Sequence, residues 1–410
     1  MLDEVDVLNN TWCFLIGSPD ISGGSYVIFQ HALYAKKAGY NVTIVTDINV
    51  DAKRLSWFPE AKSLQWETYE SVSNKKFDVA IATWWKTAFE LYRVTADHYV
   101  YFVQSIESRF YPEFEKPLRN LVDSTYTFPV HFITEAVWIK DFLKETYNKN
   151  AALVRNGILK DVYTSSGESF AQRESSKLRI LVEGPVDVLF KNVPKTINLC
   201  KEAGADEVWL LTSSPIQSFS GVDRVFSKIP IHETPKVYRS CDVVVKLSYV
   251  EGMFGPPLEM FHCGGTSITY DVTGHDEYII DGYNAVVIPT DQNSKVIDAI
   301  RRMKTDKNWL DELKKNAAKT AAEWVDWSHS SSQFKIEIDK ICTGSIGSQR
   351  NIEILSKFMY NYYLLAENYR LQLGGKDVDN LRSLKERIRN KYPRLFALLK
   401  KIRLAVFPPR

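Results

Sequence analysis

Two glutamates eight positions apart, Glu251 and Glu259, are the residues of this chain best suited to chemistry. The loop between them holds glycines and a Pro-Pro step, which is typical of the first turn of a helix. The apolar run 243–247 before it predicts a buried strand, and the helical run after it stops at Gly264. This order places both carboxylates, with Glu259 in the first helical turn, and a row of backbone N–H groups at the carboxyl edge of a parallel sheet. We therefore predict a site for an anionic, polyhydroxylated ligand, because N–H groups suit phosphate and carboxylates suit hydroxyls.

The elements around this segment alternate between strands and helices along most of the chain. Strands are predicted at 13–16, 41–46, 78–82, 99–103, 131–134 and 152–155, and again at 178–182, 207–211, 243–247, 267–270 and 285–288. Ser18 to Ser25 reads as a glycine-containing loop, and Tyr26 to Ala38 has helical spacing. The polar stretch from Thr164 to Ser176 is the best candidate for a linker. The pattern predicts an α/β protein of two doubly wound, Rossmann-like parallel-sheet domains.

Bulk composition excludes several classes of protein. The 410 residues are 45% apolar and 25% charged, which is ordinary for a soluble globular chain, and the net charge of +2 favours no nucleic-acid partner. The five cysteines are scattered and form no CxxC pair, so we expect neither a metal site nor a disulfide framework. An acidic N-terminus and no run of roughly 18 apolar residues argue against a signal peptide and a membrane span. We expect a cytoplasmic protein.

The last thirty residues, 381–410, differ from the rest of the chain in charge. They contain ten Lys or Arg and one Glu, a local charge of +9. Between Tyr392 and Phe407, apolar residues alternate with basic ones in a pattern typical of a basic amphipathic helix. Such a helix could dock on the body of the protein or attach to an anionic membrane surface. Binding to nucleic acid is disfavoured, because no aromatic platform accompanies the charge.

The segment from Ser248 to Gly264 resembles the signature of family 4 of the retaining glycosyltransferases, in which two glutamates flank seven residues. Met253 is an extra residue before Phe254, but the spacing between the two glutamates is intact. Weaker resemblances run in order through residues 12–330. They include the glycine loop at 20–24 and the later loops at 270–284.

The resemblance implies a GT-B fold, with two Rossmann-like domains facing a cleft and a helical C-terminal tail. The implied parts are an acceptor-side domain over 1–165, a nucleotide-sugar domain over 166–325, a crossover helix over 326–345 that returns to the first domain, and the basic tail over 346–410. In the family, the first glutamate lies beside the donor sugar and the second binds the nucleotide ribose. Those roles fall on Glu251 and Glu259, and Lys191 matches the lysine that holds the donor diphosphate. The other implied donor-binding residues are Gly23, Gly24, Phe254, Gly255, Pro256 and Leu258.

Two departures from the family pattern affect the site. The family places an arginine after a glycine near the diphosphate lysine, but here Gly184 is followed by Pro185. The missing cation has three candidate substitutes, which are Lys228, Lys246 and Arg173. Many members also have a histidine where this chain has Gln104.

The segment around Gln104 suggests contacts to sugars. Glu107 and Arg109 are expected to orient donor or acceptor hydroxyls. Trp84 and Trp85 either stack on sugar rings or pack in the core. The segment 101–112 is similar to a branch that uses dTDP-rhamnose in bacterial surface polysaccharides.

The resemblance therefore implies a metal-independent, retaining hexosyltransferase without a resident cofactor. Its co-substrate is a nucleotide-diphosphate sugar, such as dTDP-rhamnose, and its acceptor is a glycan on a lipid or protein carrier. Peripheral attachment at the inner face of the membrane would follow if 381–410 binds lipid. Two alternatives stay open, a nucleotide-sugar epimerase of the same fold and a non-catalytic subunit that binds nucleotide sugar or glycan. The missing arginine and Gln104 keep the second alternative open.

Overall fold

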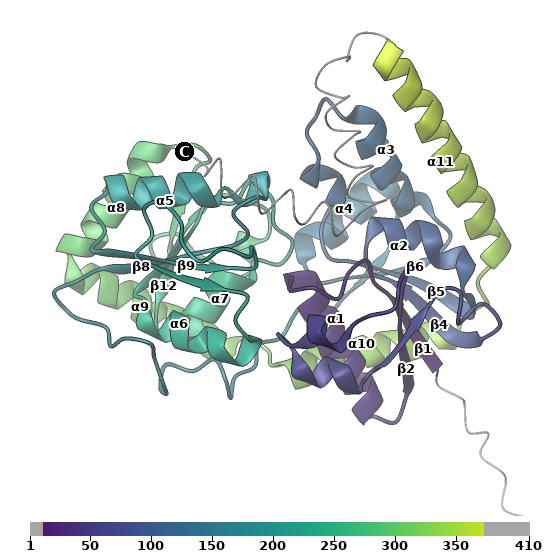
Figure 1. Ribbon diagram of the computed structural model, residues 1–410, viewed down its shortest axis with the longest axis horizontal. Coiled ribbons are helices and arrows are strands. Elements are labelled where there is room, and N and C mark those ends of the chain that lie inside the picture. The colour runs from purple at the N-terminus through teal and green to yellow at the C-terminus, as the bar shows by residue number, and fades with distance from the viewer. Residues whose placement is uncertain (1–10, 373–410) are drawn as a thin grey trace, which may run out of the picture.

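The computed structural model describes residues 11–372, which form two parallel-sheet α/β domains that lie beside each other (Figure 1). The strands of the first domain are β1 (Thr11–Leu15), β2 (Asn41–Thr46), β3 (Gln65–Thr68), β4 (Lys76–Ala82), β5 (Thr95–Val103), β6 (His131–Thr134) and β7 (Ala151–Leu153). They run in the order β3-β2-β1-β4-β5-β6-β7. Its main helices are α1 (Gly23–Lys37), α2 (Trp85–Glu90), α3 (Lys116–Ser124) and α4 (Val137–Tyr147).

The second domain repeats this arrangement with six strands. They are β8 (Arg179–Glu183), β9 (Glu207–Thr212), β10 (Arg224–Ser227), β11 (Val243–Lys246), β12 (Thr266–Tyr270) and β13 (Val286–Ile288), in the order β10-β9-β8-β11-β12-β13. Its helices are α5 (Val193–Glu202), α6 (Thr234–Ser240), α7 (Gly255–His262), α8 (Asn293–Thr305) and α9 (Lys307–Glu323). Both orders are doubly wound and reverse direction beside their first strand, so the prediction of two Rossmann-like domains is confirmed.

Strand β5 shows why these sequences form sheets that are buried on both faces. Val100 and Phe102 enter the core beneath α1, whereas Tyr99, Tyr101 and Val103 enter the core on the opposite face. Successive side chains of a strand point to opposite faces, so a strand covered by helices on both sides must be apolar throughout. The edge strands β3 and β10 are short and partly polar, and the sequence pattern did not reveal them.

Two helices after the second domain return to the first. Helix α10 (Trp327–Cys342) is capped by Asp326, whose side chain accepts a hydrogen bond from the His329 N–H at 2.7 Å. It inserts Phe334 and Ile338 into the core of the first domain. Helix α11 (Gln349–Gln372) runs along the outside of the same domain, beside α3 (Figure 1). None of the helices between residues 11 and 372 has the length and apolarity that a membrane span needs.

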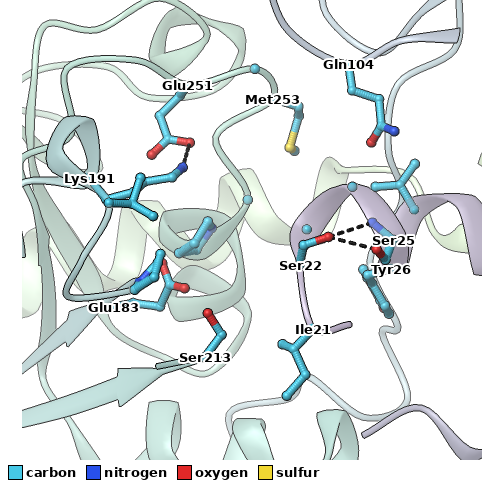
Figure 2. A pocket seen from close by; sticks show the side chains of 18 of the residues that line it. Ile21, Ser22, Ser25, Tyr26, Gln104, Glu183, Lys191, Ser213, Glu251 and Met253 are labelled. Carbon is cyan, nitrogen blue, oxygen red and sulfur yellow. Dashed lines mark hydrogen bonds and ion pairs between the residues drawn. The ribbon is translucent and has the colours of Figure 1, made fainter. Parts of the chain in front are cut away.

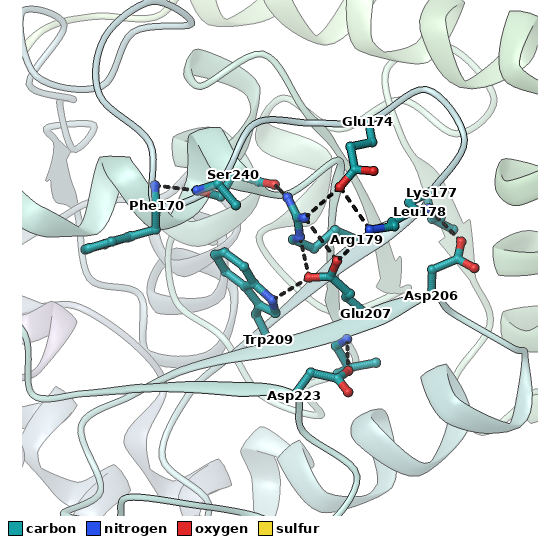
Figure 3. A network of polar contacts seen from close by, with 12 residues as sticks. Phe170, Glu174, Lys177, Leu178, Arg179, Asp206, Glu207, Trp209, Asp223 and Ser240 are labelled. Carbon is teal, nitrogen blue, oxygen red and sulfur yellow. Dashed lines mark hydrogen bonds and ion pairs between the residues drawn. The ribbon is translucent and has the colours of Figure 1, made fainter.

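The predicted linker at 164–176 contains no helix or strand and is fixed to the second domain by a polar network (Figure 3). Arg179 at the start of β8 donates from Nε to Glu207 Oε2 at 2.8 Å and from Nη1 to the carbonyl of Ser240 at 2.8 Å. The Phe170 N–H donates to Ser240 Oγ at 2.9 Å. This network lies at the amino ends of the strands, so it supports the domain from the edge opposite to the cleft.

Candidate active site

The carboxyl ends of both sheets open into one cleft of about 1590 Å³ between the domains. In doubly wound sheets the ligand site lies where the strand order reverses. Here that point lies between β1 and β4 in the first domain and between β8 and β11 in the second. Figure 2 shows the two walls, with Glu183, Lys191 and Glu251 on one side and Tyr26 and Gln104 on the other.

Glu251 is the central charged group of the second-domain wall. It follows β11, is 6% exposed, and its Oε2 lies 2.7 Å from Lys191 Nζ. Lys246 Nζ lies 3.6 Å from the other oxygen, Oε1. Burial acts to raise the pKa of Glu251, but the charges of Lys191 and Lys246 outweigh it, and the pKa lies below its ordinary value. Glu251 is therefore a buried carboxylate that stays ionised at neutral pH.

Glu259 lies in the same cleft but is not in the first turn of its helix, as the sequence had suggested. Helix α7 begins at Gly255, so Glu259 is its fifth residue and gains little from the helix dipole. Burial raises the pKa of Glu259 to about 7, although Tyr238 and Tyr163 donate hydrogen bonds to it. Its carboxyl group thus has an environment unlike that of Glu251, because lysine charges do not outweigh the effect of burial on its pKa as they do for Glu251.

The start of α7 offers fewer hydrogen-bond donors than the sequence pattern indicated. Pro256 and Pro257 have no N–H, and the Gly255 N–H already donates to the carbonyl of Met253 at 3.0 Å. Phe254 is fully buried behind the loop in a core cluster with Leu258. The expected row of free N–H groups is therefore wrong. Gly255, Pro256 and Leu258 line the cleft, whereas Phe254 does not.

The wall of the first domain begins with α1. Gly23 and Gly24 are the first residues of this helix, not part of the preceding loop, because Ser22 caps it by accepting a hydrogen bond from the Ser25 N–H at 3.0 Å (Figure 2). No atom lies within 4 Å of the place where a side chain on Gly23 would begin. The same place on Gly24 lies 3.4 Å from Gln104 Oε1. This helix end is thus open to a ligand.

The five predicted sugar contacts of the first domain separate into two groups. Three of them, Gln104, Trp84 and Glu107, line the cleft. Trp85 is buried, with its indole donating to Tyr111, so it takes the core-packing alternative. The Arg109 guanidinium lies over the rings of Trp138 and Phe142 outside the cleft wall, and its contact with a sugar stays a prediction.

Glu107 lines the cleft, but residues of its own domain donate hydrogen bonds to its carboxyl group. Its Oε2 accepts from the Trp85 N–H at 2.7 Å and from the Tyr101 hydroxyl at 2.9 Å. Burial raises its pKa to about 8, in spite of both hydrogen bonds. A carboxyl group with this pKa is mostly protonated at neutral pH, and the role of Glu107 in orienting sugar hydroxyls stays a prediction.

Sequence reasoning missed Glu135, which joins the two domains behind Glu251. Glu135 follows β6, and its Oε1 accepts from the Met253 N–H at 3.1 Å, while Trp138 Nε1 donates to the carbonyl of Gly252 at 3.0 Å. A side chain on Gly252 would begin 2.0 Å from the carbonyl oxygen of Gln104. The first domain therefore holds the loop that carries Glu251. The residue inserted relative to the family pattern, Met253, is the one whose N–H makes this contact.

Comparisons with known proteins agree with this geometry. Residues 223–320, which include β11, the Glu251 loop and α7, match the family described as glycosyl transferases, group 1. No curated protein sequence matches the chain. No group of three or more His, Cys, Asp or Glu side chains in the described part of the chain is placed to hold a metal ion.

Several solved structures share the fold, which is GT-B. Sucrose-phosphate synthase from Thermosynechococcus elongatus has a TM-score of 0.64 at 16% identity, over 82% of this chain and 100% of that one. Anabaena HepE in complex with UDP-glucose has a TM-score of 0.64 at 13% identity, over 80% and 99%. A variant of TarM from S. aureus, in complex with fondaparinux, alpha-GlcNAc-glycerol and UDP, has a TM-score of 0.63 at 10% identity, over 82% and 100%.

Proposed function

We propose that this protein is a retaining glycosyltransferase that moves a hexose from a nucleotide-diphosphate sugar to a glycan acceptor. The observation that carries the proposal is the ionised, buried Glu251 between Lys191 and Lys246 at the reversal point of the second sheet. Ammonium groups compensate a diphosphate, and a carboxylate accepts hydrogen bonds from sugar hydroxyls. The family match at 223–320 and the UDP-glucose bound to HepE support the same assignment.

The reaction needs no protein nucleophile in this proposal. The bond between the anomeric carbon and the diphosphate oxygen breaks, and the acceptor oxygen bonds to the same face of the sugar. The acceptor proton passes to the departing diphosphate oxygen, so charge and protons balance. Lys191 stabilises the negative charge on the leaving group, and Glu251 orients the sugar. Closure of the two domains around the donor excludes water from the reaction.

We further propose the identity of the substrates. The donor is dTDP-rhamnose or another nucleotide hexose, with Glu259 on the ribose, and the acceptor is a glycan on a lipid or protein carrier used in surface polysaccharide assembly. The protein works in the cytoplasm without a metal. Its basic segment 381–410, which lies outside the described residues, attaches it to an anionic membrane surface.

A donor screen tests this function directly. Thermal stabilisation by dTDP-, UDP- and GDP-sugars identifies the donor, because a ligand that binds only the folded state raises the melting temperature. With that donor, Glu251→Gln and Lys191→Ala should each lower transfer by about tenfold or more without a loss of secondary structure. Addition of EDTA should leave the wild-type rate unchanged.

Three outcomes would count against the proposal. Wild-type rates from both variants would remove the roles of Glu251 and Lys191. An altered sugar from donor alone, without acceptor, would indicate the epimerase. Donor binding without turnover on any acceptor would indicate the non-catalytic subunit. That alternative stays open because Gln104 stands where many family members have a histidine.

A further inference from the structure

A buried lysine ends the central strand of the second domain. Lys246 is the last residue of β11, and it is only 2% exposed. Its Nζ lies 2.6 Å from Oε2 of Glu183, the last residue of the neighbouring strand β8, and 3.6 Å from Glu251 Oε1. Removing an ammonium group from water is costly unless other charges compensate it. A buried lysine in the wall of a cleft therefore indicates a functional or structural role.

The neighbouring loops supply little positive charge of their own. After β8 the chain continues through Gly184 and Pro185, and the next basic residue is Lys191. The start of α7 has two prolines where N–H donors would otherwise be. Within residues 11–372, the cations beside these two loops at the cleft are Lys191 and Lys246.

Lys246 lies next to the loop position that lacks a cation. Gly184 has a φ of +135°, and a side chain there would begin 3.8 Å from Lys246 Nζ. The ammonium group thus lies against the backbone just before Pro185, which itself lines the cleft. Lys191 and Lys246 approach opposite oxygens of Glu251, at 2.7 Å and 3.6 Å. Glu251 Oε1 has no hydrogen-bond partner among residues 11–372, although it is buried.

The other two candidate cations lie elsewhere. Arg173 donates to the carbonyl oxygens of Gly264, Tyr238 and Cys263, and it is absent from the cleft wall. Lys228 lines the cleft but follows β10, three strands away from β11 in the sheet order. At about 4.8 Å per strand, that is roughly 14 Å.

We propose that Lys246 is the second diphosphate-binding cation, which reaches the donor from the end of β11 in place of a side chain at position 185. This assignment rests on the proposed function. Before the donor binds, Glu183 and Glu251 compensate the two lysines. When a diphosphate enters, Lys191 and Lys246 contact its oxygens, and Glu251 becomes free to accept hydrogen bonds from the sugar.

The test compares a nucleoside diphosphate with its monophosphate. The probe is whichever of UDP, dTDP and GDP binds the wild type most tightly by calorimetry, together with the matching monophosphate. Lys246→Met should weaken the diphosphate by about tenfold or more, because charge-assisted hydrogen bonds are lost. It should weaken the monophosphate by less than about threefold.

Two further variants separate binding from folding. Glu183→Gln combined with Lys246→Met avoids an uncompensated carboxylate and should show the same selective loss. Pro185→Arg combined with Lys246→Met should recover diphosphate affinity, because it returns a cation to the vacant loop position. Lys314→Met is the matched control. It breaks the ion pair that the half-buried Lys314 makes with the buried Asp242 at 2.7 Å, at the opposite end of β11, and should leave binding unchanged.

The outcomes are distinct. The assignment would be overturned if Lys246→Met, alone and combined with Glu183→Gln, weakened diphosphate and monophosphate equally or weakened neither. That result would leave the glycosyltransferase proposal standing. Absence of wild-type binding to UDP, dTDP and GDP would overturn the proposed function, and the assignment with it.

Discussion

At the scale of single residues, three glutamates that line one cleft, Glu107, Glu251 and Glu259, differ in their ionisation. Glu251 lies beside Lys191 and Lys246, which hold its pKa below the ordinary value. No cation among residues 11–372 offsets the burial of Glu107, which raises its pKa to about 8, while the pKa of Glu259 is about 7. The same side chain thus serves as a permanent anion in one place and as a neutral acid in another.

The raised pKa of Glu107 predicts a pH-dependent stability. Between pH 4.5, its ordinary pKa, and about 8, the folded protein binds a proton at Glu107 that the unfolded chain has released. Stability therefore falls as the pH rises through this window. Glu107→Gln keeps both hydrogen bonds without the charge, so it should unfold at a higher temperature than the wild type at pH 9. The melting temperatures should differ by roughly 2–4 °C for each kcal/mol by which the substitution raises the free energy of unfolding.

Melting curves of both proteins at pH 6 and pH 9 check this expectation. The exposed Glu312→Gln on α9 serves as the control and should follow the wild type at both pH values. A Glu107→Gln melting temperature that falls between pH 6 and pH 9 as steeply as that of the wild type would contradict the argument.

The sequence predicted Glu251 and Lys191 because both belong to a local pattern of strand, loop and helix. Lys246 remained one of three candidates, and the role of Glu183 was missed. These two residues lie 63 positions apart, and they meet only because β8 and β11 are neighbours in the sheet. A local sequence pattern predicts where strands lie but not which strands are neighbours in the sheet. Side-chain pairs between strands that are distant in the sequence are therefore seen only in the folded structure.

At the scale of elements, the loop after β11 depends on the other domain for its position. Glu135, Trp138 and the backbone of Gln104 contact residues 252–253 from the first domain. Phe110 and Phe190 also stack across the cleft, with ring centroids 4.8 Å apart. Domain closure and the position of Glu251 are therefore coupled.

Gly252→Ala should open the cleft. A methyl group on residue 252 would begin 2.0 Å from the Gln104 carbonyl oxygen, which belongs to the backbone and moves only with its domain. We expect a larger radius of gyration by small-angle X-ray scattering and a transfer rate at least about tenfold lower, because a misplaced group costs orders of magnitude. Trp138→Phe, which removes one hydrogen bond, should give a smaller effect. Unchanged scattering together with the wild-type rate in Gly252→Ala would contradict the coupling.

Element boundaries were the weakest part of the sequence analysis. The spacing of apolar residues gave the central strands, but it placed Gly23 and Gly24 before α1 and Glu259 in the first turn of α7. Both errors concern helix starts, which depend on the Ser22 cap and on the loop ending at Phe254. Capping contacts are fixed by local geometry that apolar periodicity does not describe.

At the scale of the whole molecule, α11 presents an unusual surface. Its inner side packs Ile352, Leu355 and Met359 on the first domain. Its outer side exposes large apolar or aromatic side chains along the helix: Ile354 at 55%, Phe358 at 61%, Tyr362 at 59%, Leu365 at 70% and Tyr369 at 64%. The chain then continues into residues 373–410, outside the described region, of which the last thirty carry a charge of +9.

An apolar helix face next to a strongly basic segment is the combination that binds anionic lipid surfaces. The full-length protein should therefore sediment with vesicles of phosphatidylcholine and phosphatidylglycerol, and much less with phosphatidylcholine alone or at 0.5 M salt, because about 1 kcal/mol per basic residue is electrostatic. Phe358→Ser combined with Leu365→Ser should weaken binding by about tenfold or more, since each side chain is worth about 1.5–3 kcal/mol when buried. Ile48→Ser, which is 61% exposed on the first domain, is the control and should bind as the wild type does. If the α11 variant binds vesicles as the wild type does, the segment 381–410 alone would account for membrane binding. If the wild type is a dimer and the variant a monomer, the exposed face of α11 would instead be a contact with a second copy of the chain.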